Sequence, residues 1–214
     1  MELAILKRKF ERNLMNVGWW RTIKKSLAYI LQPLYVRRTY RLYRIDLATA
    51  PEPDCPNPGE FQFALLTAED TDVIEQIERH SEWLQGQVSK KLANGQICLV
   101  ALDGRRLAGF NLIGFGEVEV PLIETCRFFR PGTAWSEHIA VLESYRRRGL
   151  GSELRYRIFR ELKCRGVRYL YGGTLRSNEP SLKLARRVGF MEYADVTYSR
   201  ILRFRRWRCR RVHR

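Results

Sequence analysis

The chain has 214 residues, of which 45% are hydrophobic and 12% aromatic, enough for one substantial core without disulfide bonds. Its net charge of +16 comes from the two ends. Residues 1–50 carry 11 Lys/Arg against 3 Asp/Glu, and residues 200–214 carry 8 arginines and no acid, whereas 51–199 has 20 of each sign. The basic ends therefore predict contact with an anionic surface, or a solubilising role, outside a neutral body.

The cysteines and the hydropathy exclude several classes of protein. Five scattered cysteines, without a C-x-x-C pair and with only three histidines, predict reduced thiols and no metal site. The uncharged interval 26–36 is shorter than the roughly 20 residues of a membrane-spanning helix, and basic residues follow it where a signal peptide would have small ones. We expect a cytoplasmic protein, soluble or attached peripherally to the inner membrane surface.

The first 50 residues are predicted to form a basic N-terminal extension. Within residues 1–36 an amphipathic helix is expected, with apolar residues at three- and four-residue spacing: Trp20, Ile23, Leu27, Ile30, Leu31 and Leu34. This helix either docks on the parent domain or lies on an anionic membrane surface. A strand is expected at 39–48, and the prolines of 51–59 mark a linker.

From residue 60 the pattern alternates between strands and helices, which predicts an α/β domain over 60–205. Strands are expected at 61–66, 97–102, 107–115, 134–142, 167–174 and about 191–205. Helices are expected at 69–80, 81–93, 149–164 and 180–187, and residues 116–133 are expected to form an insertion or lid-like loop. Residues 206–214 remain as an arginine-rich tail.

A phosphate-binding loop is predicted between the strand at 134–142 and the helix that follows it. Residues 146–151 read Arg-Arg-Arg-Gly-Leu-Gly. Glycines let the backbone approach an anion closely, and the unpaired N–H groups at a helix start point toward it. The position of the glycines directly after a strand makes the motif more informative than an isolated G-x-G.

This motif resembles the signature of the GNAT superfamily of N-acetyltransferases. Arg146, Gly149 and Gly151 fill the three defining places of the first signature. A second family pattern is matched about thirty residues downstream by Asn178, Ser181, Leu184 and Gly189-Phe190. Two independent matches in the right order argue against a chance resemblance.

The resemblance implies a fold, a co-substrate and a set of binding residues. The fold would be a mixed, mostly antiparallel central sheet flanked by helices and splayed between two central parallel strands. Acetyl-CoA or another acyl-CoA would bind to the loop amides and to the backbone near Val141, and an amine would accept the acyl group. The implied binding residues are Ile139, Ala140, Val141, Arg146, Arg147, Arg148, Gly149, Leu150, Gly151, Ser152, Asn178 and Ser181.

The chain departs from the family at Ala185, where many relatives have a tyrosine that protonates the departing CoA thiolate. Tyr171, Tyr198 or a bound water could replace it, and the sequence does not choose among them. A thiol with a pKa of about 8.5 is a fair leaving group even without a general acid.

Glu137 is the candidate general base. An alkylammonium, with a pKa of about 10.4, must lose a proton before it can attack. Glu137 lies four residues before Val141, so alternation along the strand predicts that both side chains share one face near the site. The alternative is that Glu137 only pairs with a nearby arginine. His138 is expected to point to the opposite face and to be structural.

Other arginines have competing interpretations. We expect Arg155, Arg157 and Arg160 on the exposed side of their helix. Residues 203–214 interleave arginine with aromatics, which suits anionic lipid headgroups or solvation better than nucleic acid, because no nucleic-acid-binding module is visible.

Three functions stay open at this point: an N-acyltransferase, a CoA-binding sensor or scaffold without catalysis, and a peripheral membrane adaptor that acts through its basic ends. The amine, the acyl length and the oligomeric state are not encoded in a readable pattern.

Overall fold

The computed structural model describes residues 35–51 and 60–212. They divide into a larger unit of residues 40–51, 60–196 and 210–212 and a smaller unit of residues 35–39 and 197–209. The helix expected within residues 1–36 and all but the first residue of the linker at 51–59 lie outside the described residues.

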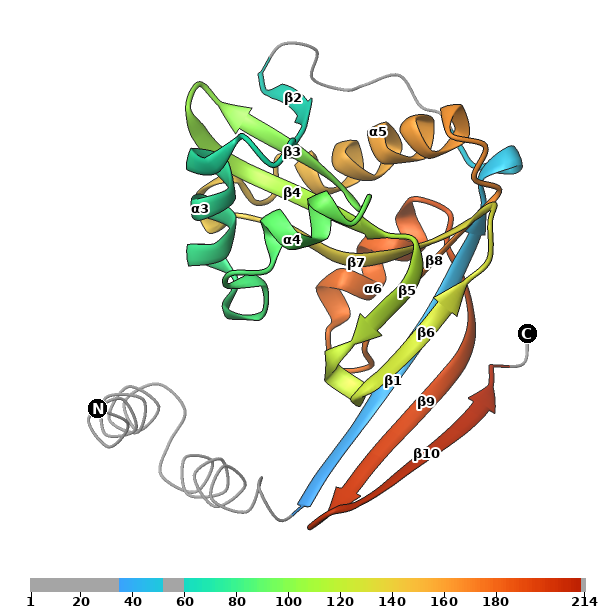
Figure 1. Cartoon of the computed structure of the whole chain (residues 1–214). Coiled ribbons are helices and arrows are strands. Elements are labelled where there is room, and N and C mark those ends of the chain that lie inside the picture. Colours follow the sequence, from blue (N-terminus) through green and yellow to red (C-terminus); the bar gives the residue numbers. More distant parts are fainter. Residues whose placement is uncertain (1–34, 52–59, 213–214) are drawn as a thin grey trace, which may run out of the picture. The chain divides into compact units, whose positions relative to one another are not determined.

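The larger unit is built on a mixed sheet whose strand order is β9-β1-β8-β7-β4-β3-β2 (Figure 1). The pairs β1–β8, β2–β3, β3–β4 and β4–β7 are antiparallel, and β7 and β8 are parallel. The strands are β1 (Tyr35–Asp46), β2 (Gln62–Leu65), β3 (Ile97–Asp103), β4 (Arg106–Gly114), β7 (Thr133–Val141), β8 (Tyr169–Leu175) and β9 (Met191–Ile201); β1 and β9 continue into the smaller unit.

Strand β1 lies inside this sheet, although the sequence placed it in the N-terminal extension. Its residues 40–46 pair with residues 169–175 of β8. Two glycines of β8 make room for its aromatic rings: a Cβ on Gly172 would lie 2.5 Å from the Tyr43 ring, and one on Gly173 would overlap the ring of Tyr40. Residues 40–46 are thus part of the central sheet.

The sheet splays between β7 and β8, as the family resemblance implies. Their parallel pairing runs from Thr133↔Tyr169 to Ser136↔Gly172 and stops there. Beyond that point β7 stays paired with β4 and β8 stays paired with β1. The segment 137–141 therefore has a strand partner on one side only.

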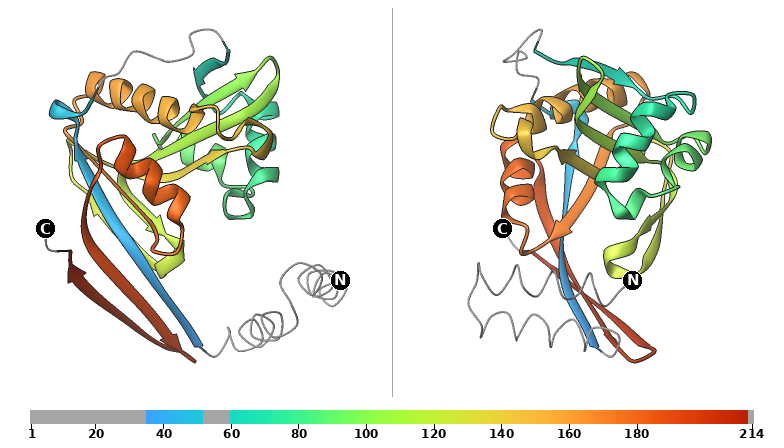
Figure 2. Two further views of the ribbon diagram at one scale, coloured as in Figure 1. Left: turned by 180° about the vertical axis from the view of Figure 1, so that it is seen from behind. Right: turned by 90° about the vertical axis from the view of Figure 1, so that its left-hand side faces the viewer.

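Helices cover both faces of the sheet (Figure 2). On one face, α5 (Leu150–Cys164) and α6 (Glu179–Arg187) pack over a core that includes Leu154, Ile158 and Phe159. On the other face, α3 (Thr71–His80) and α4 (Val88–Ala93) cover a second core around Ile77 and Phe110. The helix expected at 81–93 is a 3-10 turn, η2 (Glu82–Leu84), followed by the short α4. Further 3-10 turns are η1 (Leu47–Thr49) and η4 (Glu143–Tyr145).

The segment expected to be an insertion or lid-like loop is instead a β-hairpin. Strands β5 (Gly116–Val120) and β6 (Thr125–Phe129) pair over their whole lengths and are joined by η3 (Pro121–Ile123). Val118 and Val120 are buried while Glu117 and Glu119 are exposed. This alternation is a strand signal that the prolines and glycines of the segment obscured.

The smaller unit consists of residues 35–39 of β1, residues 197–201 of β9 and most of β10 (Phe204–Arg211). The chain reverses at Leu202, which has a left-handed φ of 53°. The final strand expected at about 191–205 therefore ends at residue 201, and the arginine-rich end forms a strand of its own. Within this unit, the Tyr198 ring packs against Trp207 at 5.5 Å, and Ile201, Leu202 and Phe204 are exposed.

Candidate active site

The predicted phosphate-binding loop leads from β7 through η4 into α5. Gly149 has a φ of 79°, a left-handed conformation that glycine adopts without strain, and a Cβ there would meet no atom within 4 Å. At the start of α5, a helix leaves its first N–H groups without intrahelical acceptors, here those of Leu150 and Gly151, whereas the Ser152 amide donates to the Gly149 carbonyl at 2.9 Å. The loop therefore has the form of an anion cradle.

Gly151 is needed for a different reason. A Cβ on this residue would lie 3.2 Å from Leu184 on α6 and 3.7 Å from Val141 on β7. The absence of a side chain lets α5 start close to both elements. Gly149 is thus required for the backbone conformation of the loop, and Gly151 is required for the packing of α5.

The three arginines of the loop are exposed and have different partners. Arg146 donates from Nε to the carbonyl of Val141 at 3.2 Å, which ties the loop to the end of β7. Arg148 lies 3.1 Å from Glu60 and over the ring of Tyr145. Arg147 has a left-handed φ of 66°. Their positive charge surrounds the cradle and would favour a diphosphate there.

Asn178 and Ser181 organise the start of α6. The Asn178 side chain accepts a hydrogen bond from the Ser181 amide at 3.3 Å and caps the helix. Burial raises the pKa of Tyr43, and the nearby Ser181 side chain opposes that rise. A direct contact of these two residues with CoA stays a prediction.

Ile139, Ala140 and Val141 lie on the half-paired segment of β7. They pair with Asn111, Phe110 and Gly109 of β4. In an antiparallel pair every second residue directs its N–H and C=O away from the partner. Those groups point into the splay, where an extended ligand could pair with them as a strand would.

A β-bulge decides where Glu137 points. Leu112 and Ile113 of β4 face His138 and Ser136, so Glu137 is an extra residue on β7. The bulge breaks the alternation, and Glu137 lies on the α4 face while Val141 packs on the α5 face. The expectation that both share one face was wrong for this reason.

The same bulge corrects the prediction for His138. Its side chain lines the same cavity as Glu137 instead of pointing to the opposite face. The ring stacks on Phe110 at 5.4 Å, and burial lowers the pKa of the imidazole. His138 is therefore neutral at pH 7 and forms part of the cavity wall.

Glu137 is a buried carboxylate that is only half satisfied. Its Oε2 accepts from Lys91 Nζ at 2.6 Å, so its partner is a lysine and not the arginine that the alternative anticipated. Its Oε1 is buried without a hydrogen-bond partner among the described residues. Burial raises the pKa of Glu137 above its ordinary value of 4.5, and Lys91 opposes that rise. Glu137 thus has one oxygen held and one free to accept a proton.

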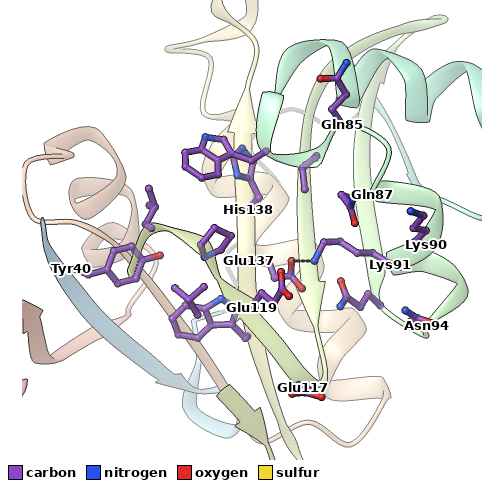
Figure 3. A pocket seen from close by; sticks show the side chains of 17 residues that line it. Tyr40, Gln85, Gln87, Lys90, Lys91, Asn94, Glu117, Glu119, Glu137 and His138 are labelled. Carbon is purple, nitrogen blue, oxygen red and sulfur yellow. Dashed lines mark hydrogen bonds and ion pairs between the residues drawn. The ribbon is translucent and has the colours of Figure 1, made fainter. Parts of the chain in front are cut away.

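A cavity of about 890 Å³ opens in front of Glu137 on the α4 face of the sheet. Its walls come from the η2–α4 segment, from β5 and η3, from β7, and from Tyr40 on β1. Figure 3 shows Lys91 reaching Glu137 from α4, with Glu119 close to both. The charge of Glu119 also raises the pKa of Glu137.

On the opposite face, the structure reveals a buried polar cluster that sequence analysis missed. Arg155 is only 2% exposed and donates to Ser136 Oγ at 2.6 Å, at the residue where the β7–β8 pairing ends. Burial lowers the pKa of its guanidinium, and the nearby Tyr43 side chain opposes that shift. No carboxylate pairs with it in the described part of the chain, and its Nε has no partner there. The prediction that Arg155 is exposed was wrong.

This cluster bears on the missing tyrosine at Ala185. Ser181 and Ala185 are one helical turn apart on α6, and the Tyr43 side chain lies near Ser181. Of the two tyrosines considered from sequence, Tyr171 packs against Phe129 and Tyr193. Tyr198 belongs to the smaller unit. The sequence assigned Tyr43 only to a strand. In the structure, its side chain lies near Ser181 on α6.

No group of three or more His, Cys, Asp and Glu side chains in residues 35–51 and 60–212 could hold a metal ion. No helix within the same ranges is long and apolar enough to cross a membrane.

Comparisons with solved structures find the same fold. A GCN5-related N-acetyltransferase from Sphaerobacter thermophilus is 20% identical with a TM-score of 0.56 over 85% of this chain and 57% of its own. One from Kribbella flavida is 14% identical with a TM-score of 0.53 over 81% and 62%. A GCN5-related glucosamine N-acetyltransferase region of a fungal multi-domain β-N-acetylglucosaminidase is 16% identical with a TM-score of 0.60. The match covers 82% of this chain and 22% of that one.

The chain spans less than two thirds of the length of the first structures that it matches. A search of curated proteins finds no match. The profile of the "Acetyltransferase (GNAT) family" matches residues 60–190, which is more than half of the sequence. Together with the splayed sheet and the loop after β7, this match shows that the chain belongs to the GNAT acetyltransferase family.

Proposed function

We propose that the chain transfers an acyl group, acetyl in the simplest case, from acyl-CoA to a primary amine. One observation carries the proposal: the segment 137–141 is unpaired on its β8 side, presents Glu137 to a cavity on one face and leads into the phosphate cradle on the other. This arrangement supports a thioester in the splay and an amine in the cavity. The two reactants would then meet at one strand, which favours direct transfer.

Glu137 is the group that makes the amine reactive. An alkylammonium with a pKa of about 10.4 has no free lone pair at pH 7. The unpartnered Oε1 of Glu137 accepts its proton, directly or through a water, while Lys91 holds Oε2 in place. The amine nitrogen then bonds to the acyl carbon and releases its second ammonium proton to water, while the carbon–sulfur bond breaks and its electron pair leaves with sulfur. Backbone N–H groups of residues 139–141 stabilise the charge on the acyl oxygen.

The leaving thiolate is stabilised by the cluster of Arg155, Tyr43 and Ser136. This guanidinium is buried at the end of the β7–β8 pairing without a counter-ion in the described residues, so its charge is available to an anion at the splay. The Tyr43 hydroxyl, which lies near Ser181 one turn from Ala185, is a proton donor on the same helix face. These residues offset the loss of the family's tyrosine.

The test measures thiol release from acetyl-CoA over a panel of primary amines, together with the melting temperature with and without acetyl-CoA. The proposal expects stabilisation by the thioester and thiol release with at least one amine. A higher melting temperature with acetyl-CoA, but no thiol release with any amine, would establish the competing hypothesis of a CoA-binding scaffold. No effect of CoA on either measurement would reject both.

The basic ends support a peripheral role at an anionic membrane on the cytoplasmic side. Within the smaller unit a groove of about 410 Å³ is lined by four arginines, Arg37, Arg205, Arg206 and Arg208, together with Thr197 and Ser199. The exposed apolar side chains of Ile201 and Phe204 also line the groove, and the exposed Leu202 lies between them in sequence. Guanidinium and hydroxyl groups suit lipid phosphates, and exposed apolar side chains suit the acyl boundary.

Vesicle flotation tests this attachment with the full chain. Binding to phosphatidylglycerol vesicles, its loss on phosphatidylcholine, and its weakening in Arg205→Glu/Arg206→Glu are expected. Equal binding to both lipids would refute the electrostatic attachment, as would an unchanged charge-reversal variant.

A further inference from the structure

The wall of the 890 Å³ cavity carries hydrogen-bond acceptors that the protein does not satisfy. Glu137 Oε1 and Gln96 Oε1 are both buried without a partner in the described residues, and the Glu137 side chain is 8% exposed. Both residues line the cavity. A buried unpaired acceptor is costly, and a ligand that donates hydrogen bonds removes that cost. An occupant that presents N–H or O–H donors therefore suits these residues.

The charges on the wall determine how many ammonium groups the cavity accommodates. Three glutamates line it, Glu117, Glu119 and Glu137, together with two lysines, Lys90 and Lys91. Lys91 already pairs with Glu137. One carboxylate remains in excess, which balances a single ammonium, whereas a ligand with several ammonium groups would meet the two lysines as like charges.

The remaining polar groups are neutral and suit hydroxyls. Four carboxamides line the cavity, those of Gln85, Gln87, Asn94 and Gln96. A carboxamide both donates and accepts, as a hydroxyl does, so the two pair in either direction. Two indole rings complete the wall, and Trp83 is 58% exposed on the η2 turn. An exposed ring beside amides and carboxylates offers a flat apolar surface for one face of a sugar ring.

We infer that the acceptor is a small polyhydroxylated amine with one ammonium group, of the amino-sugar class. Its amine lies at Glu137, its hydroxyls pair with the carboxamides, and its ring lies against Trp83. This inference rests on the proposed acyl transfer, since it names the acceptor of that same reaction.

A matched set of amines tests the class. Glucosamine and cyclohexylamine both present a primary amine on a six-membered ring, but only glucosamine has hydroxyls, and spermidine has several ammonium groups and no ring. With acetyl-CoA saturating, we expect kcat/KM for thiol release to be about 100-fold higher for glucosamine than for either other amine, since buried polar groups left unpaired penalise an analogue without hydroxyls. The class is wrong if cyclohexylamine or spermidine equals glucosamine.

Variants of the wall locate the effect. Trp83→Ala and Gln96→Leu should each raise KM for glucosamine about tenfold and leave that for cyclohexylamine unchanged. Met191→Ala is the control, because it removes a large exposed apolar side chain on β9 outside the cavity. Equal losses for both amines in Trp83→Ala would indicate a structural role and overturn the assignment.

Direct binding separates failure of the class from failure of the proposed function. Saturation-transfer NMR with glucosamine and CoA needs no turnover. Binding that Trp83→Ala weakens about tenfold would support the class even if no amine released thiol, a result that would itself refute acyl transfer to these amines. Absence of glucosamine binding, with thiol release from other amines, would refute the class and keep the transferase.

Discussion

The two faces of the sheet in the larger unit differ in how their sites are specified. On the α5 face, the cradle lies within one continuous stretch, residues 139–152, and its shape follows from local backbone rules. On the α4 face, the cavity is assembled from residues between 40 and 138 that meet only in the folded chain. A site made of adjacent residues leaves a spacing pattern in the sequence, whereas a site made by tertiary packing leaves none.

The largest effect is expected from breaking the local site at Gly149. Gly149→Glu adds strain at a φ of 79° and places a negative charge in the cradle. Like-charge contact of about 4 kcal/mol corresponds to a roughly 1,000-fold loss of CoA affinity. Isothermal titration with CoA measures it.

Gly166→Glu is the matched control. Gly166 has a φ of 72°, equally open surroundings and a position just after the other end of α5. It should lower stability without changing the affinity for CoA. Equal affinity losses in both variants would mean that the cradle does not bind the diphosphate.

The next effect tests the site that depends on tertiary packing. Glu137→Gln keeps the shape of the side chain and removes the proton acceptor, so kcat should fall about 100-fold while CoA affinity is unchanged. Only the ionised carboxylate accepts a proton, so wild-type activity should fall as pH falls through the raised pKa of Glu137. A pH–rate profile of Glu137→Gln that still showed this decline would exclude the role.

Lys91→Met sharpens this test. The pKa of Glu137 is raised by burial and held down by the hydrogen bond and charge of Lys91. Without Lys91 the pKa of Glu137 should rise further, and the acid limb of the pH–rate profile should move to higher pH. A limb that stays in place would assign the titration to another group.

Much of the fold was readable from sequence, and particular residues show why. The strand at 134–142, the helix at 149–164 and the strand at 167–174 agree with β7, α5 and β8 to within two residues, because their apolar periodicity is long and their ends carry glycine. The GNAT resemblance, which rests on motif residues at fixed spacing, was confirmed by the family match over residues 60–190. The hairpin at 116–129 was missed because Pro121, Pro131 and Gly132 within the segment 116–133 are typical of loops.

The site was only partly readable. The two motif glycines sit where the pattern placed them, but the bulge at Glu137 depends on a register between β4 and β7 that a single strand does not show. Arg155 was misassigned because a lone arginine on a helix is usually exposed. Its burial follows from Ser136 and Tyr43, which are distant in sequence.

A smaller effect is expected from the buried cluster on the α5 face. Arg155→Met removes a buried cation without a carboxylate partner in the described residues, so stability should be kept or increased. The proposed loss of thiolate stabilisation should lower kcat about tenfold. Tyr43→Phe should lower kcat less, because Arg155 remains.

Binding of CoA and desulfo-CoA gives an independent measurement of this cluster. In the wild type, the preference for CoA over desulfo-CoA should grow as pH rises toward the thiol pKa, since Arg155 favours the thiolate. In Arg155→Met this growth should disappear. A preference that is independent of pH in both proteins would show that Arg155 does not face the sulfur.

The smallest effect concerns a local contact in the turn just before α3. Asp70 Oδ2 accepts from the amide and the hydroxyl of Thr67 at 2.7 and 2.9 Å, and these hydrogen bonds hold the pKa of Asp70 below its ordinary value of 3.8. Asp70→Ala should cost at most about 1 kcal/mol, since the pair is exposed, and lower Tm by roughly 2–4 °C.

The pH dependence of this small loss identifies its cause. Because the folded-state pKa of Asp70 is lowered, its contribution is complete above the unfolded value near 3.8 and disappears as pH falls through the lower folded value. The Tm difference between wild type and Asp70→Ala should therefore shrink between pH 5 and about pH 3. A difference that stays constant would trace the loss to backbone conformation before α3 instead of to the carboxylate. The kinetics with every amine should be unchanged, because Asp70 contacts a turn and not the cavity.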